Sequence, residues 1–460
     1  MKNSQKVVIL ATSILFLASQ IAFATETSAD TAINTGDTAW VMISAALVFF
    51  MIPGLAFFYG GMVRSKNVLG TIMQSFFLIA IISVEWILIG YTLAFGEDVY
   101  GIIGDFSKAG LSNIDINSTM GTIPEFAFIT FQCMFAALTP ALITGAFAGR
   151  MRFSAFILFS LLWSLFIYNL MAHWVWGGGW LASLGALDFA GGLVIHILSG
   201  VSGLVLCLML GKRRGYGNYP MLPHHLPMVI LGTSILWIGW FGFNAGSALG
   251  ANGLAANALI VSQAAAAAGT IAWVLVEWCS HGKPTLFGAA SGCISGLVAI
   301  TPAAGFVTAI PAILIGFISG SICYFAVAVV KNKLKYDDSL DVFGIHGIGG
   351  IWGAIATGLW ANTKVNPDGA NGLFYGNPEL LWIQILSVIT AIFFATIGTF
   401  AIVKTMNLFM QIRVNEEEEA AGLDLSQHGE RGYEEKFLVG SAFDKTPNSN
   451  REFNLNTTLN

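Results

Sequence analysis

Charged residues are scarce in this sequence. Asp, Glu, Lys and Arg make up 10% of its 460 residues, whereas soluble domains average about 25%. Because 55% of the residues are hydrophobic, the chain lacks the polar surface of a soluble protein and is predicted to cross a membrane many times. Its net charge is −5, and it has no basic tail of the kind that binds nucleic acid.

Cysteine is also sparse, and its placement excludes two common uses. The chain has five cysteines, an odd number, and all of them lie inside apolar runs: Cys133, Cys207, Cys279, Cys293 and Cys323. Their spacing matches neither a metal site nor a disulfide framework. We interpret them as small hydrophobic residues, and we expect no metal site and no cofactor.

The N-terminus carries a targeting pattern. Residues 1–24 contain two lysines, the apolar run VVILATSILFLA and then Ala22-Phe23-Ala24, which precedes a polar stretch. This arrangement is typical of a cleavable signal peptide with a small-residue cleavage site. Cleavage after Ala24 would leave the mature N-terminus outside the cytoplasm. The alternative is an uncleaved first helix.

Eleven later segments are apolar and long enough to cross a bilayer. They fall at about 37–62, 69–95, 125–148, 153–176, 189–211, 226–247, 256–280, 286–303, 308–332, 343–361 and 380–411. Basic residues such as Arg64, Arg150 and Lys212 follow the odd-numbered segments, whereas acidic residues or few charges follow the even-numbered ones. Because positive residues favour the cytoplasmic side, we predict an all-α polytopic fold of eleven transmembrane helices, with the N-terminus out and the C-terminus in.

The eleven segments divide into two groups of five and a long final helix. Groups with an odd number of spans insert in opposite orientations, so the first ten segments are predicted to form an inverted five-helix repeat. One pattern recurs in both groups: His196 follows Asp188 by eight residues, and His346 follows Asp338 by eight. This recurrence supports the repeat and predicts a substrate path between the two halves.

The chain becomes polar after the last apolar segment. We therefore divide the mature protein into a transmembrane domain (25–413) and a cytoplasmic tail (414–460). The charge run Glu416–Glu419 is expected to be solvated. We expect the same of His224 and His225, which lie in a loop on the predicted cytoplasmic side.

Three ionisable residues lie deep in apolar segments, where they are costly and often functional. A lone buried histidine is most simply a core residue bonded to a backbone carbonyl, but the recurrence favours a role for His196 and His346 in a shared path. Zinc binding by this pair is disfavoured because no third ligand is evident. Glu85, in the second segment, needs a partner or a proton, and the sequence gives no account of it.

Several motifs in these segments resemble those of the Amt/Rh ammonium transporter family. They are FQCMFAALTPALITGA, HWVWGGGWLASLGALDFAGG, DFAGGLVIHILSGVSGLVLCLMLGKR, LWIGWFGFNAGSA and DVFGIHGIGGIWG. The likeness runs in order from about residue 36 to GLDLSQHGE in the tail, and it is to the bacterial Amt branch rather than the Rh branch. It implies a transporter and not an enzyme, which recruits ammonium at an outer site, deprotonates it and conducts it through a hydrophobic pore.

The resemblance assigns the outer end of this path. Trp176, Phe135 and Ser247 correspond to an outer ammonium site, where aromatic faces attract a cation and a hydroxyl accepts an N–H bond. Without the resemblance, Trp176 would equally suit the aromatic belt at the membrane interface. Phe135 and Phe243 correspond to a stacked gate that must swing for passage. Among 35 phenylalanines, only the resemblance selects these two.

The resemblance also assigns the interior of the path. His196 and His346 correspond to twin histidines, bonded to each other along the pore, and imidazole can both donate and accept a proton near neutral pH. Asp188 begins the fifth segment, where its carboxylate can cap free N–H groups; the resemblance makes it either a structural residue or a proton acceptor. Gln132 is expected in the outer vestibule.

Members of this family form homotrimers with one pore per subunit, and they bind a PII signal-transduction protein through cytoplasmic loops and the tail. The resemblance extends both expectations to this chain, in a bacterial cell inner membrane, with methylammonium as a substrate analogue. Two alternatives stay open. An ammonium sensor would bind but barely conduct, and such members usually carry an appended signalling domain. A monovalent cation channel would need carbonyl-rich filter loops, whereas these motifs supply histidine and phenylalanine.

Overall fold

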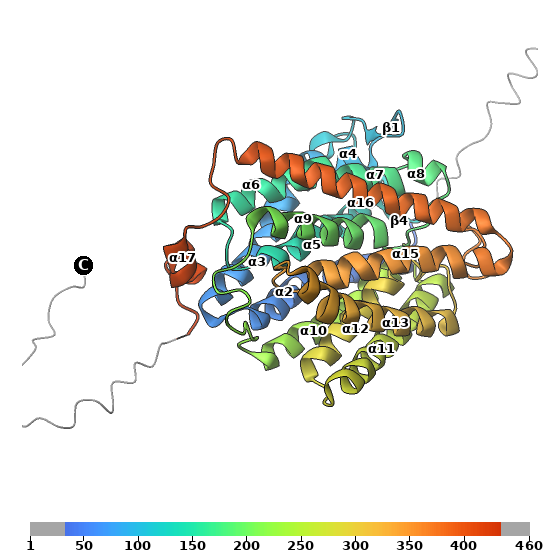
Figure 1. Ribbon diagram of the computed structural model, residues 1–460. Coiled ribbons are helices and arrows are strands. Elements are labelled where there is room, and N and C mark those ends of the chain that lie inside the picture. Colours follow the sequence, from blue (N-terminus) through green and yellow to red (C-terminus); the bar gives the residue numbers. More distant parts are fainter. Residues whose placement is uncertain (1–32, 434–460) are drawn as a thin grey trace, which may run out of the picture.

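The computed structural model describes residues 33–433, which are mostly helical (Figure 1). Within this range, two short antiparallel strand pairs lie on the connection between α4 and α5. They are β1 (Asp98–Val99) with β2 (Ile103–Gly104), and β3 (Thr119–Met120) with β4 (Ile123–Pro124). The predicted signal peptide (1–24) and the tail beyond residue 433 lie outside the described residues.

The α-helices form the bulk of the molecule. In chain order they are α2 (Thr35–Met62), α3 (Val68–Glu85), α4 (Tyr91–Phe95), α5 (Glu125–Ile143), α6 (Phe153–Trp163), α7 (Asn169–Trp176), α8 (Trp180–Ser183), α9 (Leu198–Leu210), α10 (Leu226–Trp240), α11 (Gly253–His281), α12 (Leu286–Ile300), α13 (Ala309–Phe325), α14 (Lys331–Leu334), α15 (Ile348–Trp360), α16 (Pro378–Met406), α17 (Glu416–Ala421) and α18 (Leu423–His428).

Many of these helices are joined end to end by short turns of different pitch. The π-turns are η2 (Trp86–Gly90), η5 (Ser164–Tyr168), η6 (Gly192–Ile197), η7 (Phe241–Ala245), η8 (Ala326–Val330) and η9 (Phe343–Gly347). The 3-10 turns are η1 (Ser65–Asn67), η3 (Ala109–Leu111), η4 (Thr144–Phe147) and η10 (Leu373–Tyr375). A π-turn inserts one residue into a helix and is frequent at functional sites.

Nine helical runs within residues 33–433 are long and apolar enough to cross a membrane. They are Thr35–Met62, Ser65–Phe95, Glu125–Phe147, Phe153–Ser183, Gly192–Leu210, Leu226–Ala245, Gly253–His281, Ala309–Leu334 and Pro378–Met406. The two other expected segments are also helical but shorter: α12 has 15 residues, and η9 with α15 occupies Phe343–Trp360. The many-span membrane fold is therefore confirmed, whereas the count of eleven stays a prediction.

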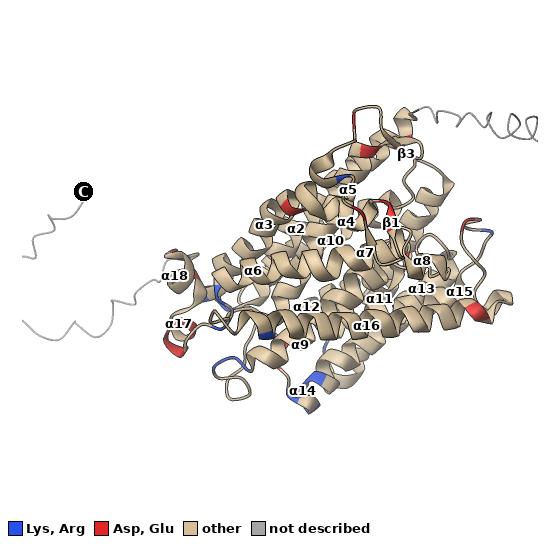
Figure 2. Cartoon of the chain, turned by 90° about the horizontal axis from the view of Figure 1, so that it is seen from above, with Lys and Arg blue, Asp and Glu red and all other residues tan. Residues whose placement is uncertain are grey.

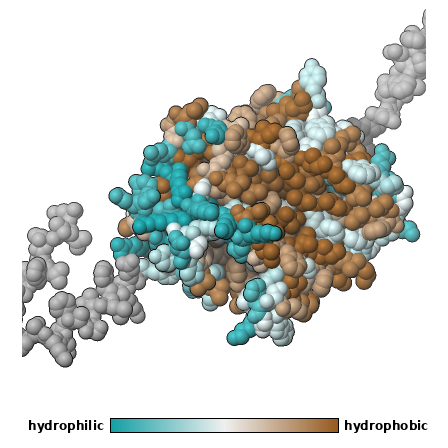
Figure 3. Space-filling model, viewed as in Figure 1, coloured by the Kyte–Doolittle hydropathy of each residue, from teal (hydrophilic) through white to brown (hydrophobic). Residues whose placement is uncertain are grey.

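The surface of the bundle suits a bilayer. The long helices lie side by side, and α16 runs along the outside against α9 and α15 (Figure 1). Much of the visible face is hydrophobic (Figure 3), and exposed apolar side chains include Phe76, Leu231 and Phe393. Most lysine and arginine residues gather at the end that carries α14, α17 and α18 (Figure 2). An apolar band with charged ends is the pattern of a membrane protein.

This basic end is organised around Arg150, whose side chain is fully buried. Its Nη1 atom donates to Asp337 Oδ2 at 2.9 Å, and its Nη2 atom donates to the carbonyl oxygens of Ala146 and Asp337 at 2.7 and 2.6 Å. Arg213 binds the second carboxylate oxygen of Asp337 at 2.6 Å. Burial would raise the pKa of Asp337, but the two arginines hold this pKa below its ordinary value. The charged cluster ties the connection after α5 to the one before η9.

The first part of the tail folds back onto the basic end. The expectation that Glu416–Glu419 is solvated was wrong for Glu419, which is 2% exposed. Its Oε2 atom pairs with Arg413 Nη2 at 2.7 Å, and its Oε1 atom accepts from the backbone N–H of Arg214 at 2.6 Å. Arg413 is six residues from Glu419, but Arg214 follows α9 and is 205 residues away, so the local sequence could not reveal that contact.

The two loop histidines also have defined partners. His224 Nδ1 lies 2.7 Å from the carbonyl oxygen of Val63, and its Nε2 lies 3.0 Å from the Tyr433 hydroxyl. His225 Nδ1 accepts from the backbone N–H of Met228 at 3.0 Å and so caps α10. The expectation that both side chains are simply solvated was therefore wrong.

Replacing Arg150 should destabilise the protein strongly. Arg150→Met removes a buried cation that donates to two carbonyl oxygens and to the buried carboxylate of Asp337, and loss of one partner from a buried ion pair should cost about 3 kcal/mol. Thermal unfolding in detergent measures the loss. Arg152→Ala serves as the control, because its pair with Glu418 is partly exposed (3.4 Å) and should contribute less than about 1 kcal/mol. Equal effects of the two substitutions would contradict the role of the Arg150 cluster.

Candidate functional site

Three cavities follow one another through the bundle, and α2 borders two of them. Met51, Leu55 and Phe58 line a narrow enclosed cavity, and Met62 lines a pocket at the basic end. These positions are spaced by four, three and four residues, so they share one face of α2. The third cavity is at the opposite end of the bundle, beside Met120 of β3.

This third cavity, called the outer pocket below, has a volume of about 390 Å³. Its lining residues are Phe95, Met120, Phe128, Gln132, Phe135, Val175, Trp176, Phe189, Ser247 and Leu249. The structure thus brings together the four residues that the sequence analysis placed at the outer site and vestibule. Trp176 Nε1 donates to the Asp188 carbonyl oxygen at 2.7 Å, which fixes its ring, and the Ser247 hydroxyl donates to the Phe243 carbonyl oxygen at 2.8 Å.

Two stacked phenylalanine rings close the inner side of the outer pocket. Phe135 and Phe243 have ring centroids 4.3 Å apart and an interplanar angle of 10°, and both side chains are buried. Phe135 also meets the edge of Trp176 at 6.3 Å, whereas Phe243 faces His196 at 6.1 Å. The stack therefore separates the outer pocket from the histidines.

His196 and His346 meet inside the enclosed cavity. Their Nδ1 atoms are 3.3 Å apart, so one ring donates and the other accepts. The other lining residues are apolar: Met51, Leu55, Phe58, Leu138, Leu142, Leu236, Trp240 and Ile294. Among the described residues, His196 Nε2 has no hydrogen-bond partner. Residues 33–433 also contain no group of three or more His, Cys, Asp or Glu side chains that could hold a metal ion.

Each histidine lies in a π-turn whose N-terminus is held by an aspartate. Asp188 is 6% exposed and accepts from four successive backbone N–H groups at the start of η6, which contains His196. Asp338 is fully buried and accepts from the backbone N–H of Phe343, the first residue of η9, at 2.8 Å. The repeated sequence spacing therefore corresponds to a repeated local structure. In each copy, an aspartate side chain accepts from free backbone N–H groups and so orients the π-turn that contains the histidine.

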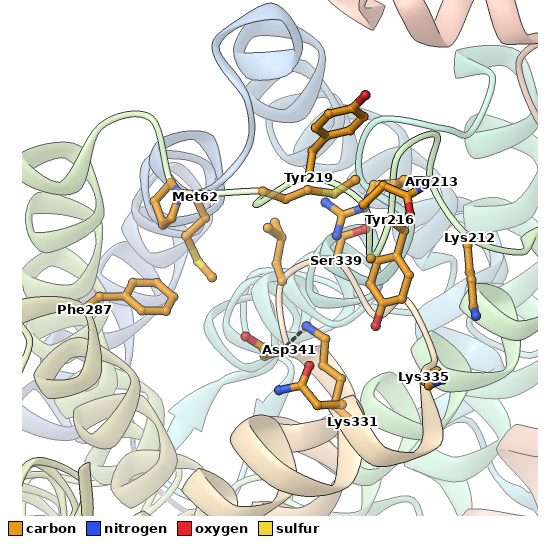
Figure 4. A pocket seen from close by; sticks show the side chains of 16 residues that line it. Met62, Lys212, Arg213, Tyr216, Tyr219, Phe287, Lys331, Lys335, Ser339 and Asp341 are labelled. Atoms are coloured by element: carbon orange, nitrogen blue, oxygen red, sulfur yellow. Dashed lines mark hydrogen bonds and ion pairs between the residues drawn. The ribbon is translucent and has the colours of Figure 1, made fainter. Parts of the chain in front are cut away.

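The pocket at the basic end has a volume of about 560 Å³. Met62 and Phe287 form an apolar side, and Lys331 points across the pocket to pair with Asp341 (Figure 4). Arg213 and Tyr216 line the same space. This pocket is wide and charged, unlike the enclosed cavity, so it resembles a mouth rather than a binding site for a small apolar molecule.

Sequence reasoning missed part of the outer pocket. Phe95, Phe128 and Phe189 line it, but they come from separate segments and nothing in their spacing distinguishes them. His173, on α7, has its Nε2 atom 2.8 Å from Asp98 Oδ1 and its Nδ1 atom 3.1 Å from a backbone carbonyl oxygen. Only the folded structure reveals these partners.

Comparison with known proteins gives consistent results. The family model of the Ammonium Transporter Family matches residues 39–433. The ammonium transporter of Bacillus subtilis is 55% identical over 402 residues, which cover 87% of this chain and 99% of that protein. The ammonium transporter of Aquifex aeolicus is 50% identical over 423 residues, which cover 91% and 97%.

Solved structures agree with the sequence comparisons. The crystal structure of Saccharomyces cerevisiae Mep2 matches with a TM-score of 0.82 at 35% identity, covering 89% of this chain and 93% of that one. A solved sensor Amt protein matches with a TM-score of 0.79 at 28% identity, covering 85% and 98%. Fold alone therefore does not separate transporters from sensors, but the family model and the identities are sufficient to assign the family. This chain belongs to the ammonium transporter family.

Proposed function

We propose that this multi-pass membrane protein transports ammonium by recruiting it in the outer pocket, removing its proton and passing ammonia through the enclosed cavity. The observation that carries the proposal is the order of three environments along one path. An aromatic pocket with polar acceptors comes first, then two stacked rings, then an apolar cavity with two bonded histidines. The family and the names of its relatives support the choice of substrate.

Recruitment relies on attraction that does not need a full negative charge. The faces of Trp176 and Phe135 attract a cation, by roughly 1–2 kcal/mol where it is partly desolvated. Ser247 has free lone pairs for an N–H bond. The buried Oε1 atom of Gln132 has no hydrogen-bond partner among the described residues, so it can accept another. Together these groups suit an ion that carries several N–H donors.

Selection follows from what lies beyond the stacked rings. Potassium and ammonium have nearly the same size, but only ammonium can lose its charge by releasing a proton. The cavity beyond Phe135 and Phe243 is apolar, so a bare cation would enter at a high cost. Ammonia can enter and bond to the imidazoles of His196 and His346, and the two bonded rings can also relay the released proton. Asp188 either orients this region or accepts the released proton.

The alternatives fit this path less well. A monovalent cation channel would line its filter with carbonyl oxygens, whereas the enclosed cavity is lined by apolar side chains and two histidines. An ammonium sensor shares the fold, and the relatives with higher identity are named as transporters.

We further propose eleven spans in an inverted five-helix repeat, with the N-terminus out and the C-terminus in, and a homotrimer in a bacterial cell inner membrane. The paired aspartate-capped π-turns support the repeat, the basic residues near α14 support the orientation, and the bacterial relatives support the localisation. A PII protein would bind at the basic end, where α17 and α18 are folded against the loops.

Uptake of labelled methylammonium tests the function. Cells that lack their own ammonium transporters should gain saturable uptake, which excess potassium should inhibit little. Trp176→Leu should raise the half-saturation concentration about tenfold, because a cation–π contact is lost. Trp382→Leu is the matched control, since Trp382 is 69% exposed on α16. Uptake that never saturates would refute the transporter, and strong inhibition by potassium would favour a channel.

Removal of both pore histidines tests the mechanism. His196→Ala combined with His346→Ala should abolish selective transport and lower the methylammonium rate at least about 100-fold, since positioned proton-transfer groups contribute about that much. His225→Ala, outside the path, should transport normally. If both selectivity and rate survived in the double variant, the proposed role of the histidines in proton transfer would be wrong.

The orientation can be tested with single cysteines. In a Cys279→Ser background, which removes the exposed native thiol, Tyr100→Cys should react with a membrane-impermeant maleimide in intact cells. Leu222→Cys should react only after permeabilisation, because the basic end faces the cytoplasm. Both positions are highly exposed, at 93% and 72%. The reverse labelling pattern would invert the proposed topology.

A further inference from the structure

Glu85 is an acidic residue inside an apolar span, and it is 8% exposed. It ends α3, directly before the π-turn η2. Its Oε1 atom accepts from Asn169 Nδ2 at 2.8 Å, and its Oε2 atom accepts from the Ser164 hydroxyl at 3.2 Å. Within residues 33–433, no Lys, Arg or His forms an ion pair with it. Its partners are therefore neutral donors rather than a cation.

The two partners of Glu85 bracket a second π-turn. Ser164 is the first residue of η5, and Asn169 is the first residue after it. A π-turn inserts one extra residue into the helix, which rotates everything beyond it by about 100°. One carboxyl group therefore bonds to both ends of the segment that sets the rotation of α7.

The rotation of α7 sets the direction in which the Trp176 side chain leaves the helix, and the bond from its Nε1 atom to the Asp188 carbonyl oxygen then holds the ring. Asn169 and Trp176 are seven residues apart and therefore lie on the same face of α7, about 10 Å apart along the axis. Between them, His173 ties α7 to Ala94 and Asp98 at the end of the second span. The helix is thus held against the second span at two levels, and Trp176 comes on the next turn, in the outer pocket.

The second span makes room for the Glu85 carboxyl. A Cβ atom on Gly90 would lie 2.9 Å from Oε2 and 3.1 Å from Oε1 of Glu85, so a larger residue there would force the carboxyl to shift. Beyond Gly90, the same span carries Phe95 into the outer pocket. Trp86, next to Glu85, packs against Tyr168 of η5 with ring centroids 6.4 Å apart. The two π-turns therefore contact each other at the level of Glu85.

We propose that Glu85 is a positioning residue for the outer pocket. It acts as a hydrogen-bond acceptor that fixes η5, and thereby the placement of Trp176, without touching the transported ion. A charged group is unnecessary for this role, since both partners are neutral and a charge in the membrane is costly. The inference rests on the proposed function, because it assumes that Trp176 binds the cation.

The test separates binding from turnover in methylammonium uptake. Glu85→Leu should raise the half-saturation concentration about tenfold, as for a weakened cation–π contact, with the maximal rate within about twofold of the original. Glu85→Gln should behave like the original protein, because its amide oxygen can accept from Asn169 while its amide NH2 donates to the Ser164 hydroxyl, which can also act as an acceptor. Glu85→Leu combined with Trp176→Leu should be no worse than Trp176→Leu alone, since residues that act through one contact are not additive.

Gly90→Ala provides a second route, because it crowds the carboxyl without removing it and should raise the half-saturation concentration in the same direction. This variant decides the matter if Glu85→Leu does not accumulate in the membrane. If Glu85→Leu and Gly90→Ala both left the half-saturation concentration unchanged, the inference would be overturned. Additive effects of Glu85→Leu and Trp176→Leu in the double variant would also overturn it. A lowered maximal rate in both Glu85→Gln and Glu85→Leu would instead make the acid a proton carrier.

The two proposals can fail separately. If Trp176→Leu changes the half-saturation concentration but Glu85→Leu and Gly90→Ala do not, only the inference about Glu85 is wrong. If Glu85→Leu changes it but Trp176→Leu does not, the outer site as proposed is wrong, and Glu85 acts on another part of the pocket.

Discussion

The hydrocarbon core contains no water, so each polar group placed there must find its partner within the protein. The rest of the structure follows from this constraint. Asp188 and Asp338 satisfy backbone N–H groups at the start of two π-turns. His196 and His346 bond to each other, and Glu85 bonds to neutral side chains. The two aspartates therefore hold the starts of their own turns, whereas the His196–His346 pair and the bonds of Glu85 each join two spans.

The same constraint gives the proposed path its selectivity. The protein does not need to discriminate ions by size, because any permanent cation would have to lose its hydration shell to enter the apolar cavity, which is unfavourable. An ion that can give up its proton avoids that cost. The outer pocket then has only to concentrate and orient the cation, for which aromatic faces and a few acceptors suffice. A carboxylate in the outer pocket would stabilise the ammonium cation and would therefore hinder the loss of its proton and the release of ammonia.

Local signals in the sequence predicted much of this structure. Hydropathy located the spanning helices, and the regular spacing between aspartate and histidine identified residues that share one cavity. Contacts between distant segments were less accessible. The stacking of Phe135 and Phe243 could be expected only through family resemblance, since nothing in their spacing distinguishes them from the other phenylalanines. The π-turns have no recognised sequence signal, so the partners of Glu85 stayed unknown. Glu419 was expected to be solvated because the contact with Arg214, which helps to bury it, is formed only in the folded protein.

The parallel packing of Phe135 and Phe243 has a consequence for the membrane potential of a cell. Because the rings are in contact, the proposed path would be shut at rest, and each passage along it would require them to move apart. The rate of transport would then depend on how often the rings open. A membrane could contain many copies of such a protein and remain electrically insulated, since the shut state gives protons and alkali ions no wet route. The membrane potential that powers the rest of the cell would then be preserved whenever the rings are shut.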